Sequence, residues 1–166
     1  MLGITHAVFG VLFALPFYMG WGEGNLILFG FAMLGSLLPD FDHPKSFIST
    51  LNSSIQFLSR HVSRIVLHRG IFHTLLAAMM AFIATTSLAL YFDASLLYPF
   101  FLFVGYISHL AADSLNPTGV RWLRPFRESS VSFRVHTGGI GERAICALIV
   151  AFLTLFWLWQ IGMFEL

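Results

Sequence analysis

Residues 35–46 read GSLLPDFDHPKS, and they mark the place where a long apolar run gives way to charged side chains. The residues just before, 30–34, carry no charge, whereas Asp40, Asp42 and His43 follow within four positions. Ionisable groups are costly inside a membrane segment and usually serve a function there. This stretch therefore indicates both an apolar helix that ends here and a polar site at its end.

The composition indicates a membrane protein. The chain has 166 residues, of which 57% are hydrophobic and 10% are charged, and its mean hydropathy is +0.81. A soluble domain carries about 25% charged residues. Cys146 is the only cysteine and lies in an apolar run. A single cysteine excludes an internal disulfide and a cysteine-rich metal site. We interpret residues 1–166 as a single membrane domain.

Five apolar segments approach the length of roughly 17 to 25 residues that a spanning helix needs. They cover residues 4–19, 25–38, 71–92, 96–112 and 144–164. No Lys or Arg precedes the first segment, so we interpret it as a retained helix rather than a signal peptide. The sequence therefore predicts an all-α, polytopic membrane protein with about five transmembrane helices.

The basic residues predict the orientation of these helices. All nine lie in two loops, one between the second and third segments and one between the fourth and fifth: Lys45, Arg60, Arg64, Arg69, Arg121, Arg124, Arg127, Arg134 and Arg143. The positive-inside rule places both loops in the cytoplasm. We therefore expect an inner-membrane protein with its N-terminus inside and its C-terminus outside.

Both basic loops carry a pattern of their own. Apolar residues recur at helical spacing over 47–66, which predicts an amphipathic helix lying in the membrane interface or a cover packed over the helix ends. The second loop mixes arginines with aromatic residues, a combination that anchors to lipid headgroups. Alternation over 131–135 predicts a short strand there.

The ionisable residues gather at the cytoplasmic ends of the predicted helices. Eight potential metal-binding side chains from four helices lie at this one level of the membrane: His6, Asp40, Asp42, His43, His68, His73, His109 and Asp113. Each of them alone has an ordinary explanation as a cap, a turn former or an interfacial residue. Their convergence favours a metal site, with a purely structural polar cluster as the alternative.

The spacing of these residues refines the prediction. His109 and Asp113 are four apart and share one face of a helix. Asp40 and Asp42 would point the same way in an extended segment after Pro39. Imidazole and carboxylate donors without a thiol suit zinc, and also manganese or iron. Because eight donors exceed the needs of one ion, we expect two ions.

Four blocks carry a resemblance to a known family: ITHAVFG, LGSLLPDFDHPKS, HRGIFHTLL and GYISHLAADSLNPTGVRWLRPF. In this order they resemble the YdjM/DUF457 family of bacterial and archaeal inner-membrane proteins, described as metal-dependent hydrolases. That family is thought to be distantly similar to zinc-dependent phospholipase C and the S1/P1 nucleases. The resemblance implies ligand roles for one set of residues, His6, Asp40, His73, His109 and Asp113. It leaves Asp42, His43 and His68 as further ligands or catalytic groups.

Two residues of the last loop and helix remain open at this stage. Glu142 is either a late carboxylate ligand or an acid that stabilises the start of its helix through the macrodipole. His136 is either part of the site or a loop residue.

We therefore expect a membrane-embedded, metal-dependent hydrolase that acts on a phosphoester of a lipid or a lipid-linked substrate, with no nucleic-acid partner. Asp40 or Asp42 would take a proton from the attacking water, and Arg69, with Arg121 or Arg124, would stabilise the anionic headgroup. The alternatives are a metal or proton transporter and a non-enzymatic membrane scaffold. A transport path needs polar groups at more than one depth, but the outer half of the predicted helices has no matching ionisable groups and the last segment carries no charged residue.

Overall fold

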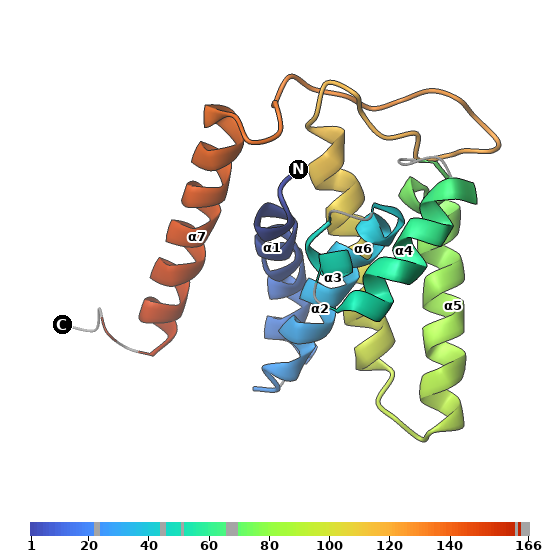
Figure 1. Ribbon diagram of the computed structural model, residues 1–166. Helices are drawn as coiled ribbons and strands as arrows, with labels where there is room; N and C mark the ends of the chain where they lie inside the picture. Colours follow the sequence, from blue (N-terminus) through green and yellow to red (C-terminus); the bar gives the residue numbers. More distant parts are fainter. Residues whose placement is uncertain (22–23, 44–45, 51, 66–69, 162, 164–166) are drawn as a thin grey trace.

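The fold is known from a computed structural model of the chain. It describes residues 1–21, 24–43, 46–50, 52–65, 70–161 and 163, and within these ranges it leaves out the side chains of 42, 47–48, 55, 58 and 62–65. Helices dominate throughout (Figure 1). In the described part of the chain no segment forms a strand, and the predicted strand over 131–135 is reduced to a single antiparallel bridge between Val120 and Val131.

Three helices form the centre of the molecule: α1 (Gly3–Trp21), α2 (Ile27–Leu37) and α6 (Leu97–Ser114). Helices α2 and α6 approach closely because glycines face the partner backbone. A Cβ atom on Gly105 would overlap the carbonyl group of Ala32, and one on Gly35 would overlap the carbonyl group of Leu102. This contact holds the C-terminal end of α2 against α6, and so brings Asp40, which follows α2, toward His109 and Asp113 in the last turns of α6.

Two further helices flank this centre. Helix α5 (Leu75–Tyr91) packs on α6 and begins at Thr74, whose hydroxyl accepts a hydrogen bond from the amide of Ala77 at 3.1 Å. Helix α7 (Ile140–Gln160) packs on α1 and stands at the edge of the molecule (Figure 1). Among its described residues only Glu142 and Ile149 are buried.

The predicted helix over 47–66 is divided into α3 (Phe47–Thr50) and α4 (Ser53–Ile65). The division follows from Asn52, whose side chain accepts a hydrogen bond from the amide of Ser54 at 2.8 Å and so starts a new helix. Both helices pack on η1 (Leu38–Asp42), a 3-10 helix that directly follows α2. The segment therefore covers the C-terminal end of α2. This agrees with the second of the two predictions for this loop, a cover packed over the helix ends.

The η1 helix corrects the expected extended conformation of 39–42. Pro39 lies in its first turn, where the fixed φ of proline and its missing N–H are compatible with a helical turn. The structure describes the side chain of Asp40 but not that of Asp42. The backbone of both residues thus belongs to a helical turn and not to an extended segment.

Length and composition identify two described helices that could cross a membrane, α1 and α7. The apolar helical stretches Ile27–Phe41 and Leu75–Tyr91 are shorter. The helices nevertheless fall at the five predicted segments, with small shifts at their ends. The expectation of five full spans thus goes beyond what the helix lengths establish.

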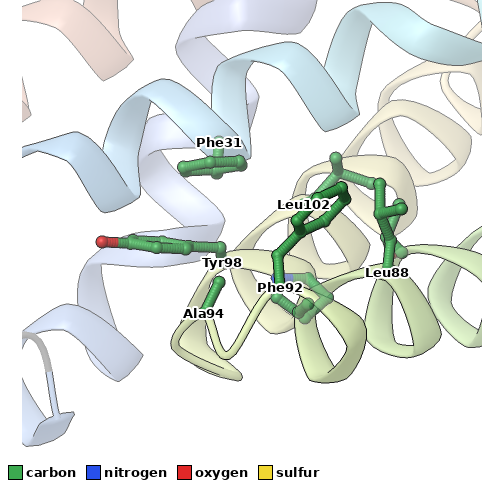
Figure 2. A pocket seen from close by; sticks show the side chains of 9 residues that line it. Phe31, Leu88, Phe92, Ala94, Tyr98 and Leu102 are labelled. Atoms are coloured by element: carbon green, nitrogen blue, oxygen red, sulfur yellow. The ribbon is translucent and has the colours of Figure 1, made fainter.

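An apolar cavity of about 210 Å³ lies between the end of α5 and the start of α6 (Figure 2). The rings of Phe31 and Tyr98 stack at its wall with their centroids 4.7 Å apart. Its other walls come from Leu88, Phe92 and Leu102. The lining is almost entirely apolar. The histidines and aspartates lie at the other end of these helices, near the start of α5 and the end of α6.

Candidate metal centre

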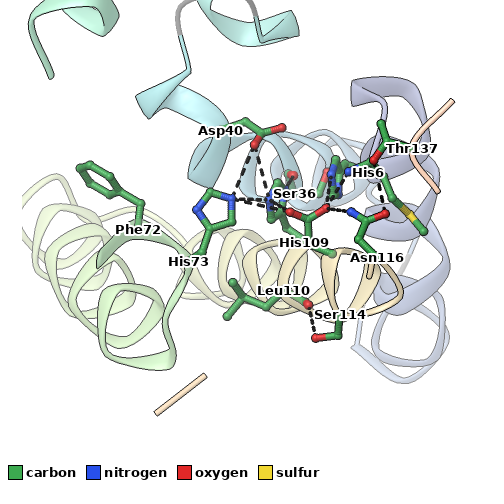
Figure 3. A network of polar contacts seen from close by, with 12 residues as sticks. His6, Ser36, Asp40, Phe72, His73, His109, Leu110, Ser114, Asn116 and Thr137 are labelled. Carbon is green, nitrogen blue, oxygen red and sulfur yellow. Dashed lines mark hydrogen bonds and ion pairs between the residues drawn. The ribbon is translucent and has the colours of Figure 1, made fainter. Parts of the chain in front are cut away.

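A cluster of histidines and aspartates occupies the end of the helix bundle opposite the apolar cavity (Figure 3). His109 and Asp113 come from the last two turns of α6, and His6 comes from the first turn of α1. His73 ends the short 3-10 helix η2 (Ile71–His73), and Asp40 belongs to η1. Helices that are distant in sequence therefore bring five donors to one place.

The donors form two groups of three that share His109: one holds His6, His109 and Asp113, the other Asp40, His73 and His109, and the atoms of each group lie within 4.8 Å of one another. The Nε2 atoms of His73 and His109 are 3.2 Å apart. Asp40 Oδ1 lies 3.6 Å from the first nitrogen and 3.8 Å from the second, and Asp113 Oδ2 lies 3.8 Å and 3.9 Å from them. Four tetrahedral ligands of zinc are about 3.3–3.6 Å apart when each bond is about 2.0–2.2 Å. Asp40, His73 and His109, whose donor atoms are 3.2–3.8 Å apart, fit three ligands of such an ion, and Asp113 Oδ2 lies beside the two histidines.

The ring of His109 is held in the orientation that a metal ligand needs. Its Nδ1 lies 2.7 Å from the carbonyl oxygen of Ser36. Because a carbonyl only accepts a hydrogen bond, Nδ1 carries the proton and Nε2 presents its lone pair to His73 and the aspartates. A backbone carbonyl that fixes the tautomer of a ligating histidine is the usual arrangement in metal sites.

The carboxylate of Asp113 faces two sides. Its Oδ2 faces His73 and His109, whereas its Oδ1 accepts hydrogen bonds from the amino group of Met1 at 2.6 Å and from Asn116 Nδ2 at 3.0 Å. The same Oδ1 lies 3.4 Å from His6 Nε2. Asp113 would therefore hold an ion together with His6 and His109, and its Oδ2 also lies near His73.

The His6 ring is buried and stacks on that of His109, with their centroids 3.8 Å apart. Neither nitrogen of His6 has a hydrogen-bond partner among the described residues. A buried polar atom without a partner costs about 1–3 kcal/mol. A cation bound between His6 and Asp113 would remove that cost, which is the second observation that fits a metal.

Burial differs between the members of the cluster. His6, His73, His109 and Asp113 are buried, whereas the side chain of Asp40 is 18% exposed. Burial raises the pKa of the Asp40 carboxyl group, but the contact with His73 and the charges of the surrounding histidines hold the net pKa well below its usual range. Asp40 is therefore ionised at neutral pH and forms the accessible edge of the cluster.

His73 is positioned by hydrogen bonds from α6 and from the following loop. The hydroxyl of Tyr106 donates to the carbonyl of the preceding residue, Phe72, at 2.5 Å. The amide of Leu75 donates to the carbonyl of Trp122 at 2.9 Å, and the indole of Trp122 donates to Ser114 at 2.9 Å. These bonds fix the short η2 segment between α5 and α6.

The other predicted site residues are not all part of this cluster. His43 caps the end of η1 and belongs to neither group of donors found among the described residues. His68, Arg69 and the side chain of Asp42 lie outside the described residues. Arg121 and Arg124 are on the surface, 3.5 Å and 3.4 Å from Glu128.

The two residues left open by the sequence also have definite places. Glu142 is buried and accepts hydrogen bonds from the amides of Leu2 at 2.6 Å and Gly138 at 2.5 Å. Its oxygens therefore bind backbone groups, which favours the structural reading of this carboxylate. His136 is exposed in the loop before α7.

Sequence reasoning missed the residues that orient the donors. Ser36 acts through its backbone carbonyl, so its side-chain identity carries no signal. Tyr106 and Trp122 form hydrogen bonds to residues near His73 that are distant in sequence, so only the fold reveals these contacts. Asn116 could have been found, because a residue three positions after Asp113 lies beside it at the end of a helix.

The fold and the cluster together define a class: an all-helical protein with apolar helices of membrane-spanning length and groups of His and Asp side chains that could hold a metal ion. The sequence model of the family described as "YdjM inner membrane protein" matches residues 1–165. The chain belongs to the YdjM inner membrane protein family, and the resemblance found in its four sequence blocks is confirmed.

The chain is similar to two curated proteins named "Inner membrane protein YdjM", from Escherichia coli (strain K12) and from Shigella flexneri. It is 42% identical to each over 100 residues, which cover 58% of this chain and 48% of the relative. The chain thus spans about half the length of these relatives. It is also 28% identical over 151 residues to "Uncharacterized protein YvsG" of Bacillus subtilis (strain 168), covering 89% of this chain and 88% of that protein. No solved structure matches the chain.

Proposed function

We propose that this protein is a metal-dependent hydrolase of the inner membrane that cleaves a phosphoester of a lipid or a lipid-linked substrate. The observation that carries the proposal is the group of donor atoms from Asp40, His73 and His109, which lie 3.2 to 3.8 Å apart, with Asp113 Oδ2 within 3.9 Å of both histidine nitrogens. Two imidazole nitrogens that face each other at 3.2 Å are held together by a shared proton or by a cation, and the carboxylates beside them favour the cation.

Zinc is the expected ion, because two imidazole nitrogens and two carboxylate oxygens suit its coordination; manganese or iron are alternatives. A second ion would lie between His6 and Asp113, which form the other group of three donors with His109. Bound divalent ions polarise a phosphoryl oxygen and lower the pKa of bound water to near neutrality. The protein holds the donors rigidly through Ser36 and Asn116 and keeps most of the cluster away from solvent.

The accessible edge of the cluster supports the choice of substrate. Asp40 is the least buried of the five donors, and it lies on η1 beneath α3 and α4. We propose that a substrate approaches from the η1 side and that Asp40 or Asp42 accepts a proton from the attacking water. Arg69 is proposed to stabilise the anionic headgroup. A membrane lipid is the most abundant phosphoester at the level of the helix ends.

Five spans with both basic loops in the cytoplasm are part of the proposal. The donors support it, because they come from the start of α1 and α5 and from the end of α2 and α6. Cysteine labelling tests it in a Cys146→Ser background, with Asp93→Cys and Glu128→Cys, both at exposed positions. We expect an impermeant maleimide to label position 93 and not position 128 in intact cells. The reverse pattern would refute this orientation.

Lipid turnover tests the hydrolase directly. Protein purified in detergent is incubated with phospholipid extract and with polyprenyl phosphates, and ³¹P NMR follows new phosphate species. We expect turnover that falls at least about 100-fold in Asp113→Asn and His109→Ala, because each removes a donor. His61→Ala, on the exposed face of α4, is the matched control and should retain turnover. Bound metal without turnover of either substrate would refute this substrate class.

A further inference from the structure

Glu142 is a buried carboxylate with no part in the donor cluster. It is the third residue of α7, a helix that is otherwise largely exposed, and its own exposed fraction is 0%. Burying a carboxylate costs free energy unless hydrogen bonds replace its hydration. The contacts of this side chain therefore explain why it is placed here.

Both carboxylate oxygens of Glu142 accept backbone hydrogen bonds. Oε2 accepts from Gly138, just before the residue that caps α7, so the side chain folds back over the start of its own helix as the acid of a capping box does. Oε1 accepts from Leu2 at 2.6 Å, which lies 140 positions away and directly precedes α1. One carboxylate thus joins the start of α7 to the start of α1.

Leu2 connects this contact to the metal centre. Its carbonyl oxygen accepts the amide of His6 at 3.1 Å, which is the hydrogen bond of the first turn of α1. The place of Leu2 therefore sets where α1 begins and where His6 projects, one turn later. The ring of His6 then stacks on His109, and its Nε2 lies 3.4 Å from Asp113 Oδ1.

We propose that Glu142 is a positioning residue of the metal centre, which holds His6 in place through Leu2. The inference rests on the proposed function, because that function requires the metal. The contact between Glu142 and Leu2 does not depend on a bound metal. It gives α7 a role in the site: the helix at the edge of the molecule supplies the group that fixes the first turn of α1.

Two variants break the contact from opposite sides. Glu142→Gln keeps the size of the side chain but replaces one acceptor oxygen by an amide donor, so only one of the two backbone N–H groups can still be bound. Leu2→Pro removes the N–H of Leu2 and leaves Glu142 intact. Glu128→Gln is the matched control, because it removes the same charge from an exposed carboxylate of the preceding loop.

Hydrogen exchange measured by mass spectrometry on the metal-free protein tests the contact alone. We expect the amides of residues 3–9 to exchange about tenfold faster in Glu142→Gln and in Leu2→Pro than in the wild type, and Glu128→Gln to match the wild type. If Glu142→Gln does not fold, Leu2→Pro decides the outcome. Unchanged exchange in the variant that folds would overturn the proposal.

Titration with Co²⁺, followed by visible absorption, tests the action through His6. Glu142→Gln is expected to bind the ion beside His6 about tenfold more weakly, within the range for outer contacts of a metal site. In a His6→Ala background the same change should cause no further loss, because residues that act through one another are not additive. Independent, additive losses would overturn the proposal. A wild type that binds no Co²⁺ would refute the proposed function, while the exchange result would still decide the role of Glu142.

Discussion

The Nε2 atoms of His73 and His109 lie 3.2 Å apart, although 36 positions separate the two residues. Because the Nδ1 proton of His109 is directed to the carbonyl of Ser36, its Nε2 is a lone pair that faces the second ring. Two such nitrogens are held together either by a shared proton or by a cation. The two aspartates around them favour the cation, which makes this pair the centre of the account.

Asn116 is expected to support metal binding through Asp113. Its Nδ2 donates to Asp113 Oδ1 at 3.0 Å, and its side-chain Oδ1 accepts from the hydroxyl of Thr137 at 3.3 Å. Asn116→Ala frees the carboxylate to rotate and should weaken zinc binding about 10–100-fold in competition titrations with a chromophoric chelator. Thr118→Ala, two residues further in the same turn, is the control. Equal affinities of Asn116→Ala and the wild type would contradict this role.

Tyr106 is expected to stabilise the segment that carries His73. In Tyr106→Phe the carbonyl of Phe72 loses a partly buried hydrogen bond of 2.5 Å, which should lower the free energy of unfolding by about 1–2 kcal/mol. Thermal unfolding in detergent, followed by circular dichroism, measures the change. Tyr98→Phe removes a hydroxyl at the apolar cavity and should leave the transition nearly unchanged. A larger effect at Tyr98 than at Tyr106 would argue against the assignment.

Gly105 is expected to be irreplaceable in the contact between α2 and α6. A methyl group there would overlap the backbone of Ala32, so Gly105→Ala should cost about 1–3 kcal/mol of stability, or force the helices apart. Gly30→Ala is the control on α2, because a Cβ atom at that position meets nothing within 4 Å. Comparable unfolding temperatures for the two variants would show that the close approach is not needed.

The sequence predicted the helical class and the approximate place of each helix, because apolar segments between charged loops carry that information directly. It also predicted that His109 and Asp113 share a helix face, which follows from their spacing alone. It did not predict the break between α3 and α4 or the 3-10 turn at Asp40. Those depend on local side-chain hydrogen bonds at Asn52 and on Pro39, which periodicity does not register.

The arrangement of the site required the fold. Ser36 holds His109 through a backbone carbonyl, and Tyr106 holds His73 through the carbonyl of Phe72. Neither contact has a sequence signature, since the first uses no side chain of Ser36 and the second joins residues 34 positions apart. Glu142 had a helix-start explanation from its position, but its bond to Leu2 depends on how α7 packs beside α1.

The most direct test of the central claim is the metal content of the purified protein. Wild type and variants are purified in detergent, equilibrated with zinc, dialysed against metal-free buffer and analysed by inductively coupled plasma mass spectrometry. The account predicts one to two equivalents of zinc in the wild type and in His61→Ala, and a loss of at least one equivalent in His109→Ala and in Asp113→Asn. A wild type that retains no divalent metal, or variants that retain as much as the wild type, would contradict it.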